Sequence, residues 1–378
     1  TEPITGYDPG IIEKILAAGG AFSDDDTDIE YVDLFVMEKH GPEPTYENLA
    51  EFWQRCINHH IRVANRAARD LMKQGYLPPH TGRRGINPHW DKIDPQLVCE
   101  IWAVTAPGML RYAAAKADWA AKVTNDDYGT HPTIWYNTMY AAAFHETDVE
   151  RLCQIGYEHL PAGSIFRAAI DDVRQWKREA GDDWVTVRRR IKEKYLDGVG
   201  LPPDITKDKV SALLNGTLGV LALLYGGGDF ESTLNLSCMA GYDADNQCAT
   251  LAGLLALMKG SASIPRKYLY LDEGWTQPLN DRYRNLTRDE LPDGSLTEIA
   301  RRTAAQGREL VLRNGGRVES LPGREMLVIR PDARFISPIE VRIFPVHIPA
   351  GQEAVVRPEV IGGPPDARIS VGLAGTLP

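Results

Sequence analysis

Apolar residues recur with a helical period over nearly all of the first 310 residues, which leaves little of this region for a β-sheet. The first helical segment runs from Thr27 to about His40, where Gly41 and Pro42 end it. Further amphipathic segments are predicted at about residues 47–75, 95–123, 133–146, 147–157, 163–178, 183–195 and 207–225. The pattern predicts a mainly α fold, a compact bundle of helices joined by loops rich in proline and glycine.

The sequence pattern changes from helical to β-type after Gly315 and Gly316. Four short β-type runs follow, with proline and glycine between them: EMLVIRP, IEVRIFPVHIP, EAVVRPEV and ARISVGLAG. We therefore predict a helical domain over residues 1–316 and a small β-rich appendage over residues 317–378. A packing or oligomerisation role is the simpler interpretation of the appendage, and binding of a partner is the alternative.

Composition narrows the possible partners and locations. The net charge of −10 argues against a surface for polyanions, so we expect no nucleic-acid partner. No apolar run reaches the roughly 18–20 residues of a membrane span, and the first residues lack the basic and apolar regions of a signal peptide. The five cysteines are odd in number and show no C-x-x-C spacing, which makes a disulfide framework improbable. These observations predict a protein of the cytoplasm without a membrane partner, and they leave its oligomeric state open.

Two acidic clusters stand out from this background. In GAFSDDDTDIEY, residues 20–31, five carboxylates fall within seven positions, directly ahead of an apolar helix. In the second cluster Asp243 and Asp245 precede a helix whose small residues permit close approach of a neighbouring helix: Ala249, Ala252, Gly253 and Ala256. Both clusters therefore lie at the start of a helix that is expected to be buried.

Two interpretations of these clusters are open from spacing alone. Aspartate is favoured at a helix N-terminus, where it can cap free N–H groups and meets the positive end of the helix dipole. Capping explains one aspartate per helix, not three in a row. Crowded carboxylates raise one another's pKa unless a cation neutralises them, and Mg²⁺ or Mn²⁺ prefers such oxygen ligands. Two converging clusters would make a dinuclear site that positions substrate and activates water.

Other motifs offer no competing chemistry. The sequence contains no H-E-x-x-H, G-x-S-x-G, Walker-type G-x-x-x-x-G-K or dinucleotide-binding G-x-G-x-x-G after a strand. Residues 226–228, GGG, are interpreted as a helix stop rather than a phosphate-binding loop. His59 and His60 are predicted to lie within an amphipathic helix in a structural role.

The two acidic motifs resemble those of the ADP-ribosylglycohydrolase family. The family has T-D-D-T near the start of its domain and G-x-D-x-D-(T/N) before an A/G-rich helix near the end. Here residues 24–27 are DDDT, residues 241–246 are GYDADN, and IPRKYL at residues 264–269 also resembles the family. The resemblance covers about residues 1–310.

The resemblance implies an all-α orthogonal bundle with two Mg²⁺ or Mn²⁺ ions in a cleft. It implies Asp25, Asp26, Asp243 and Asp245 as direct ligands, with Asp24 and Asn246 standing where the family usually has threonines. Asp26 is the carboxylate expected to orient the attacking water. Glu2 is aligned with a family glutamate and is the other predicted catalytic residue.

By this resemblance the chain is predicted to hydrolyse an N- or O-glycosidic bond of ADP-ribose, releasing it from a small molecule or a protein. The family's glycine-rich opening helix is missing from this sequence, and the insert PPHTGRRGINPHWDKIDP sets it apart. One alternative is therefore a hydrolase of another riboside or furanoside with the same dinuclear site. The other is a non-catalytic, crystallin-like structural protein, against which the retention of four aspartates speaks.

Overall fold

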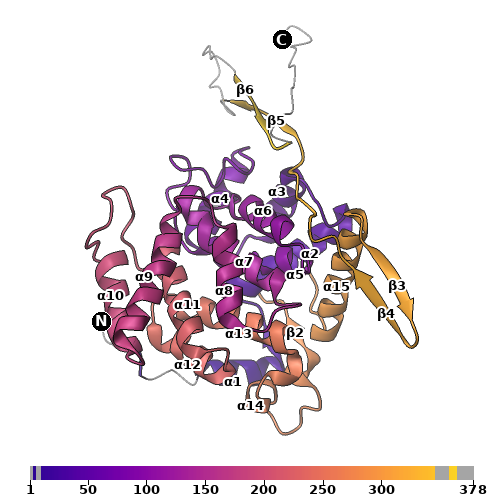
Figure 1. Ribbon diagram of the computed structural model, residues 1–378. Helices are drawn as coiled ribbons and strands as arrows, with labels where there is room; N and C mark the ends of the chain where they lie inside the picture. The colour runs from indigo at the N-terminus through magenta and orange to yellow at the C-terminus, as the bar shows by residue number, and fades with distance from the viewer. Residues whose placement is uncertain (1–2, 6–9, 345–356, 364–378) are drawn as a thin grey trace.

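The computed structural model describes residues 3–5, 10–344 and 357–363, and the prediction of a mainly α fold is confirmed (Figure 1). The helices in chain order are α1 (Gly10–Ala18), α2 (Asp25–His40), α3 (Tyr46–Cys56), α4 (Val63–Lys73), α5 (Glu100–Val104), α6 (Leu110–Ala121), α7 (His131–Ala142), α8 (Val149–His159), α9 (Ile165–Ala180), α10 (Trp184–Tyr195), α11 (Ala212–Gly226), α12 (Phe230–Ala240), α13 (Ala244–Lys259), α14 (Arg266–Leu269) and α15 (Leu296–Arg313). None of these described helices combines the length and the apolarity that crossing a bilayer requires.

Helices α7 and α11 form the centre of the bundle. Both are buried on nearly every face, and α11, ALLNGTLGVLALLYG, is apolar all round as a central helix should be. Helices α6 and α8 pack on α7, while α9, α10, α12 and α13 pack around α11. The helix α11 ends at Gly226, and the left-handed backbone of the next residue, Gly227 (φ 57°), confirms the predicted helix stop.

The prediction of one continuous helix over residues 47–75 is wrong, as is the placement of His59 and His60 within it. Helix α3 ends at Cys56 and α4 begins at Val63, so both histidines lie in the connection between them. Arg288, far along the chain, donates hydrogen bonds to the main-chain carbonyls of His59 and His60. Because a distant side chain takes these carbonyls, they are not available to continue the helix.

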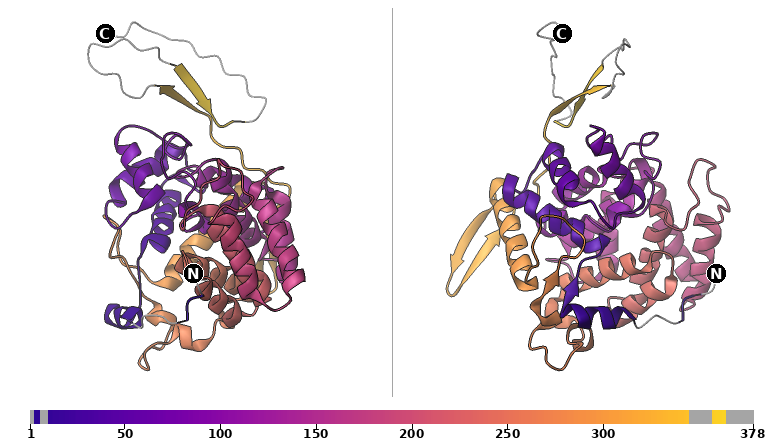
Figure 2. Two further views of the ribbon diagram at one scale, coloured as in Figure 1. Left: turned by 90° about the vertical axis from the view of Figure 1, so that its left-hand side faces the viewer. Right: turned by 180° about the vertical axis from the view of Figure 1, so that it is seen from behind.

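Within the described residues the strands form three separate two-stranded sheets: β1 (Ala21–Phe22) with β2 (Tyr283–Arg284), β3 (Arg317–Leu321) with β4 (Arg324–Val328), and β5 (Glu340–Phe344) with β6 (Arg357–Ile361). The last two pairs are antiparallel and project from different sides of the helical body (Figure 2). Three of the four β-type runs of the sequence overlap with β4, β5 and β6. The run ARISVGLAG, at residues 367–375, lies outside the described residues.

The parallel pair β1–β2 places the first acidic cluster. Ala21 pairs with Tyr283 and Phe22 with Arg284, and the next residue, Ser23, donates its N–H to the Arg284 carbonyl at 2.8 Å. Helix α2 starts immediately afterwards. The start of α2 is therefore fixed against a segment that follows α14 in the chain.

Candidate functional site

The carboxylates of the first acidic cluster differ in what they contact. Asp24 is the N-cap of α2, and its Oδ1 accepts a hydrogen bond from the Thr27 N–H at 3.2 Å. Asp25 is the first residue of the helix. The side chain of Asp26 and the whole of Glu2 lie outside the described part of the structure. In this cluster, capping accounts for Asp24 alone.

The second cluster is arranged differently. Asp243 occupies the N-cap position of α13, yet its side chain makes no capping hydrogen bond. The connection from α12 is tight, with positive φ at Gly241 (78°) and Tyr242 (65°), and the Asp243 N–H donates to Asn215 Oδ1 at 3.1 Å. The backbone of Asp243 is thus anchored to α11, while its carboxylate is not used to cap its own helix.

The fold brings the two clusters together. The pKa of Asp243 is raised to about 7, first by burial, then by the charge of the neighbouring Asp245 and a hydrogen bond with it, and last by the charge of Asp25. Asp25 starts α2 and Asp243 precedes α13, so residues from opposite ends of the helical domain share one electrostatic environment. Of the predicted ligands, the structure places Asp25, Asp243 and Asp245 in this shared region.

Asp94 belongs to the same region and was not predicted from the sequence. It begins a short 3₁₀ turn (Asp94–Gln96), is 3% exposed, and accepts the Asn65 N–H at 2.8 Å through Oδ1. Its Oδ2 is buried without a hydrogen-bond partner. Burial raises the pKa of Asp94 to about 7, and the charge of Asp243 contributes. In the sequence Asp94 is only an aspartate before a proline in a loop. Ordinary turns have the same pattern, so it does not mark a site residue.

Asn246, the other predicted ligand, is 1% exposed and faces a buried polar layer. Its Oδ1 accepts a hydrogen bond from Gln247 Nε2 at 3.0 Å, and its Nδ2 donates to Thr250 Oγ1 at 3.4 Å. Gln247 in turn accepts a hydrogen bond from the Tyr136 hydroxyl of α7. The start of α13 is therefore held by side chains from the centre of the bundle.

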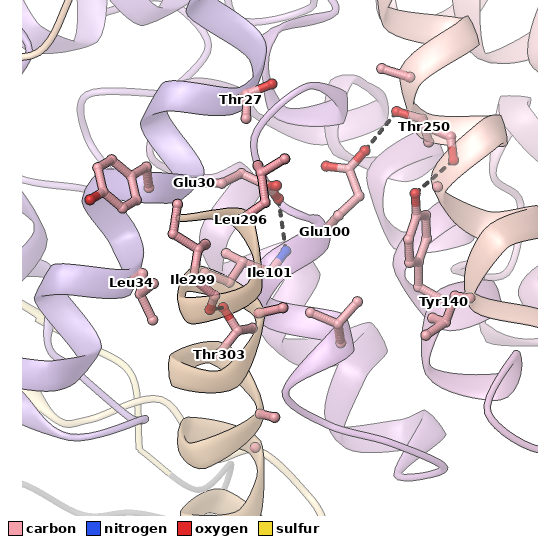
Figure 3. A pocket seen from close by; sticks show the side chains of 18 of the residues that line it. Thr27, Glu30, Leu34, Glu100, Ile101, Tyr140, Thr250, Leu296, Ile299 and Thr303 are labelled. Carbon is pink, nitrogen blue, oxygen red and sulfur yellow. Dashed lines mark hydrogen bonds between the residues drawn. The ribbon is translucent and has the colours of Figure 1, made fainter. Parts of the chain in front are cut away.

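A cavity of about 700 Å³ lies next to the acidic clusters. Helices α2, α5, α7, α13 and α15 supply most of its walls, which are largely apolar (Figure 3). Thr27 and Asn246, one from each acidic motif, are among its lining residues. The small residues of α13 contribute Ala249 and Gly253 to the wall. The size suits a small-molecule ligand.

Two glutamates form a polar spot in this apolar wall and point toward one another from α2 and α5 (Figure 3). Glu30 Oε1 accepts the Ile101 N–H at 2.8 Å, and Glu100 Oε1 accepts the Thr250 hydroxyl at 2.6 Å. Burial raises the pKa of both carboxyls, and that of Glu30 is raised further by the charge of Glu100. The charges that act on the Glu30 pKa come from two other carboxyls, Glu100 and Asp33, and both raise it.

The donor chemistry of the acidic region fits a hard divalent cation. Asp243 has a carboxylate that caps nothing, and Asp94 Oδ2 is a buried oxygen without a partner. Within the described side chains, no three Asp, Glu, His or Cys residues are close enough to hold a metal ion together. Asp26, which the resemblance makes a direct ligand, is not part of that set. The identity of the ligands therefore stays a prediction.

Comparison with known proteins gives one finding. Residues 2–308 match the family model described as ADP-ribosylglycohydrolase. A search of curated proteins returned no match. The matched range contains both acidic motifs and all the helices that line the cavity except the last residues of α15.

Proposed function

Because this chain belongs to the ADP-ribosylglycohydrolase family, we propose that it hydrolyses a glycosidic bond of ADP-ribose and releases ADP-ribose from an acceptor. The acceptor is a small molecule or a protein side chain. One structural observation supports the proposal most: Asp25 and Asp243 lie near enough for the charge of one to raise the pKa of the other. Two motifs that are distant in the sequence are thus close enough to contribute to the proposed site.

We propose that this site holds two Mg²⁺ or Mn²⁺ ions. Asp25, Asp26, Asp243 and Asp245 would bind them, with oxygen atoms of Asp24 and Asn246 beside them. When bound, the ions would supply Lewis-acid binding of ribose hydroxyls and of the attacking water. Crowded carboxylates favour this arrangement, because a divalent cation removes the repulsion that they otherwise exert on one another.

The protein's own carboxylates would direct the reaction. In this proposal Asp26 accepts a hydrogen bond from water and aims its oxygen at the anomeric carbon, which gains oxocarbenium character as the glycosidic bond breaks. Glu2 is the second proposed catalytic carboxylate. Asp24 remains the cap of α2, so its replacement of the family's threonine keeps the helix start in place.

We propose that the acceptor group binds in the cavity. Its apolar walls and the Glu30–Glu100 pair suit an uncharged or cationic group, whereas a diphosphate would lose hydration there that apolar walls cannot replace. Arg308 is the one basic residue among the described residues of the lining, and it lies 3.8 Å from Glu325. The diphosphate of ADP-ribose would therefore remain outside the cavity, on the other side of the acidic clusters.

The same scarcity of basic groups supports a second candidate function, the hydrolysis of a riboside that has no diphosphate. The chemistry at the anomeric carbon would be unchanged. The two candidates differ only in whether a substrate needs the diphosphate in order to be cleaved.

The deciding experiment measures free ADP-ribose released from arginine- and serine-linked ADP-ribosyl peptides, with Mg²⁺ and after chelation. Release that chelation stops, and that Asp243→Asn abolishes, is the expected result. Ribosides without a diphosphate are assayed in parallel, and cleavage of these alone would select the second candidate. If Asp243→Asn leaves both Mg²⁺ binding and hydrolysis unchanged, the metal site is rejected. A folded protein that cleaves none of them would support a non-catalytic role.

A further inference from the structure

Two cysteines flank the second acidic motif. Cys238 lies in the last turn of α12 and Cys248 in the second turn of α13, with the connection that carries Asp243 and the start of α13 between them. Their Sγ atoms are 2.8 Å apart. All five cysteines of the chain are described and carry thiols, and the other three are buried on α3, before α5 and on α8: Cys56, Cys99 and Cys153.

The surroundings keep these two sulfurs together. Helices α12 and α13 pack closely along their length, and the positive φ angles of Gly241 and Tyr242 make the connection short. Cys248 Sγ also contacts the Leu234 carbonyl at 3.7 Å, which directs it toward α12. An S–S bond is about 2.05 Å long, so bond formation requires the two sulfurs to approach one another further.

We propose that Cys238 and Cys248 are a reversible disulfide site that, when oxidised, closes residues 239–247 into a covalent loop around Asp243 and Asp245. This modification needs no assumption about the reaction that the chain catalyses. Its effect on cation binding rests on the proposed function, because Asp243 and Asp245 are proposed ligands there.

The oxidant is a low-molecular-weight disulfide, RSSR. Cys238 is the more accessible of the two thiols and reacts first. Its thiolate attacks one sulfur of RSSR, the R–S–S–R bond breaks, and one thiolate RS⁻ leaves. The Cys248 thiolate then attacks the Cys238 sulfur of the mixed disulfide, and the second RS⁻ leaves. The two RS⁻ ions take up the two protons that the cysteines lost and become two RSH molecules. RSSR is thereby reduced by two electrons.

The oxidised loop would hold the end of α12 against the start of α13. Asp243 and Asp245 would then have fewer arrangements to lose when a cation binds, so the affinity for the cation should increase. Reduction would restore the freer state. The pair would make the acidic site responsive to the thiol–disulfide balance around the protein.

The test uses the full chain treated with oxidised glutathione. The number of titratable thiols under denaturing conditions should fall from five to three. Cyanogen bromide cleaves after Met139, Met239 and Met258, so Cys238 and Cys248 fall in separate fragments, residues 140–239 and 240–258. These fragments should migrate together until a reductant is added.

Matched variants assign the bond. Cys238→Ser and Cys248→Ala should each abolish the link, while Cys153→Ser, which alters the other cysteine of fragment 140–239, should leave it intact. Fragments that separate without reductant, or a Cys238 that stays joined to glutathione, would overturn the proposal. Mn²⁺ titration of the oxidised and reduced chains provides the second readout, with tighter binding expected after oxidation. An intact link with equal Mn²⁺ binding would reject the effect on the cation while keeping the disulfide.

Discussion

Arg288 and Asp28 form an ion pair that is closed to solvent: Nε lies 2.7 Å from Oδ2, and neither side chain is exposed. The Thr287 hydroxyl donates a hydrogen bond to the same carboxylate. Arg288 also donates to the carbonyls of His59 and His60. One guanidinium therefore joins α2, the connection between α3 and α4, and the segment after β2.

Replacing Arg288 with methionine should destabilise the fold strongly. The variant would leave the Asp28 carboxyl buried without its charged partner, which typically costs about 3–5 kcal/mol of unfolding free energy. Urea unfolding followed by circular dichroism measures the loss. The double variant Asp28→Asn with Arg288→Met should recover part of it, and a loss below about 1 kcal/mol in the single variant would show that the pair is dispensable.

At Asp24 the capping role predicts a contrast between two substitutions. Asp24→Ala removes the acceptor for the Thr27 N–H and should cost about 1 kcal/mol, whereas Asp24→Asn keeps an acceptor and should cost little. Thermal or urea unfolding of both variants provides the comparison. Equal losses would mean that the charge of Asp24, rather than its hydrogen bond, stabilises the start of α2.

For Asp243 the opposite pattern is expected. Its side chain caps nothing and is crowded by Asp245 and Asp25, so Asp243→Asn should leave the unfolding free energy unchanged or higher in the absence of divalent cations. Activity should fall by about 100-fold or more, the scale of losing a group that acts in the transition state. A loss of stability as large as that of Asp24→Ala would contradict a role confined to the site.

The Glu30–Glu100 pair predicts how stability changes with pH. The folded state raises the pKa of Glu30 above its unfolded value of about 4.3. Above that pH the unfolded chain releases a proton that the folded chain still holds, so stability falls as pH rises until the raised pKa is passed. Glu30→Gln removes this penalty.

The gain in unfolding free energy of Glu30→Gln over the parent should therefore be larger at pH 8 than at pH 5, as measured by urea unfolding at both values. Glu298→Gln is the control. An ion pair with Arg301 lowers the pKa of Glu298, so its removal should act with the opposite sign, and weakly because the pair is exposed. A gain that does not change with pH would argue against the raised pKa.

Adjacent alanines on α15 allow the cavity to be tested. Ala304 lines the cavity and Ala305 does not, and both side chains are exposed. Ala304→Trp should raise KM for the cleaved substrate by filling the cavity, while Ala305→Trp should leave KM unchanged. The unfolding free energy of both variants should stay close to that of the parent. Equal KM values would show that the substrate does not use the cavity.

Much of the helical architecture could be predicted from the sequence, because periodic apolar residues and turn residues are local signals. Examples are the helix predicted from Thr27 to about His40, which the structure has at Asp25–His40, and the helix stop at Gly227. The break at residues 57–62 could not be predicted, because it depends on Arg288, which is brought there only by the completed fold.

The candidate site shows the same division. The motifs around Asp25 and Asp243 are visible as clusters of charge, and their expected proximity agrees with the electrostatics of the fold. Asp94 and Glu100 are single carboxyls in unremarkable segments. Their significance comes from burial and from neighbours far away in the sequence, such as Asp243 for one and Thr250 for the other. The spacing of residues along the sequence does not reveal such long-range contacts.

The pairing of β1 with β2 has a consequence for the order of events during synthesis. A nascent chain that has not yet reached residue 283 lacks both the strand partner of Ala21 and Phe22 and the arginine that neutralises Asp28. The start of α2 therefore cannot be fixed in its final position while most of the domain is being translated. Closing so long a span of chain is a slow, non-local step. Assembly of the acidic site should thus be among the last events of folding, after the ribosome has delivered nearly the whole domain.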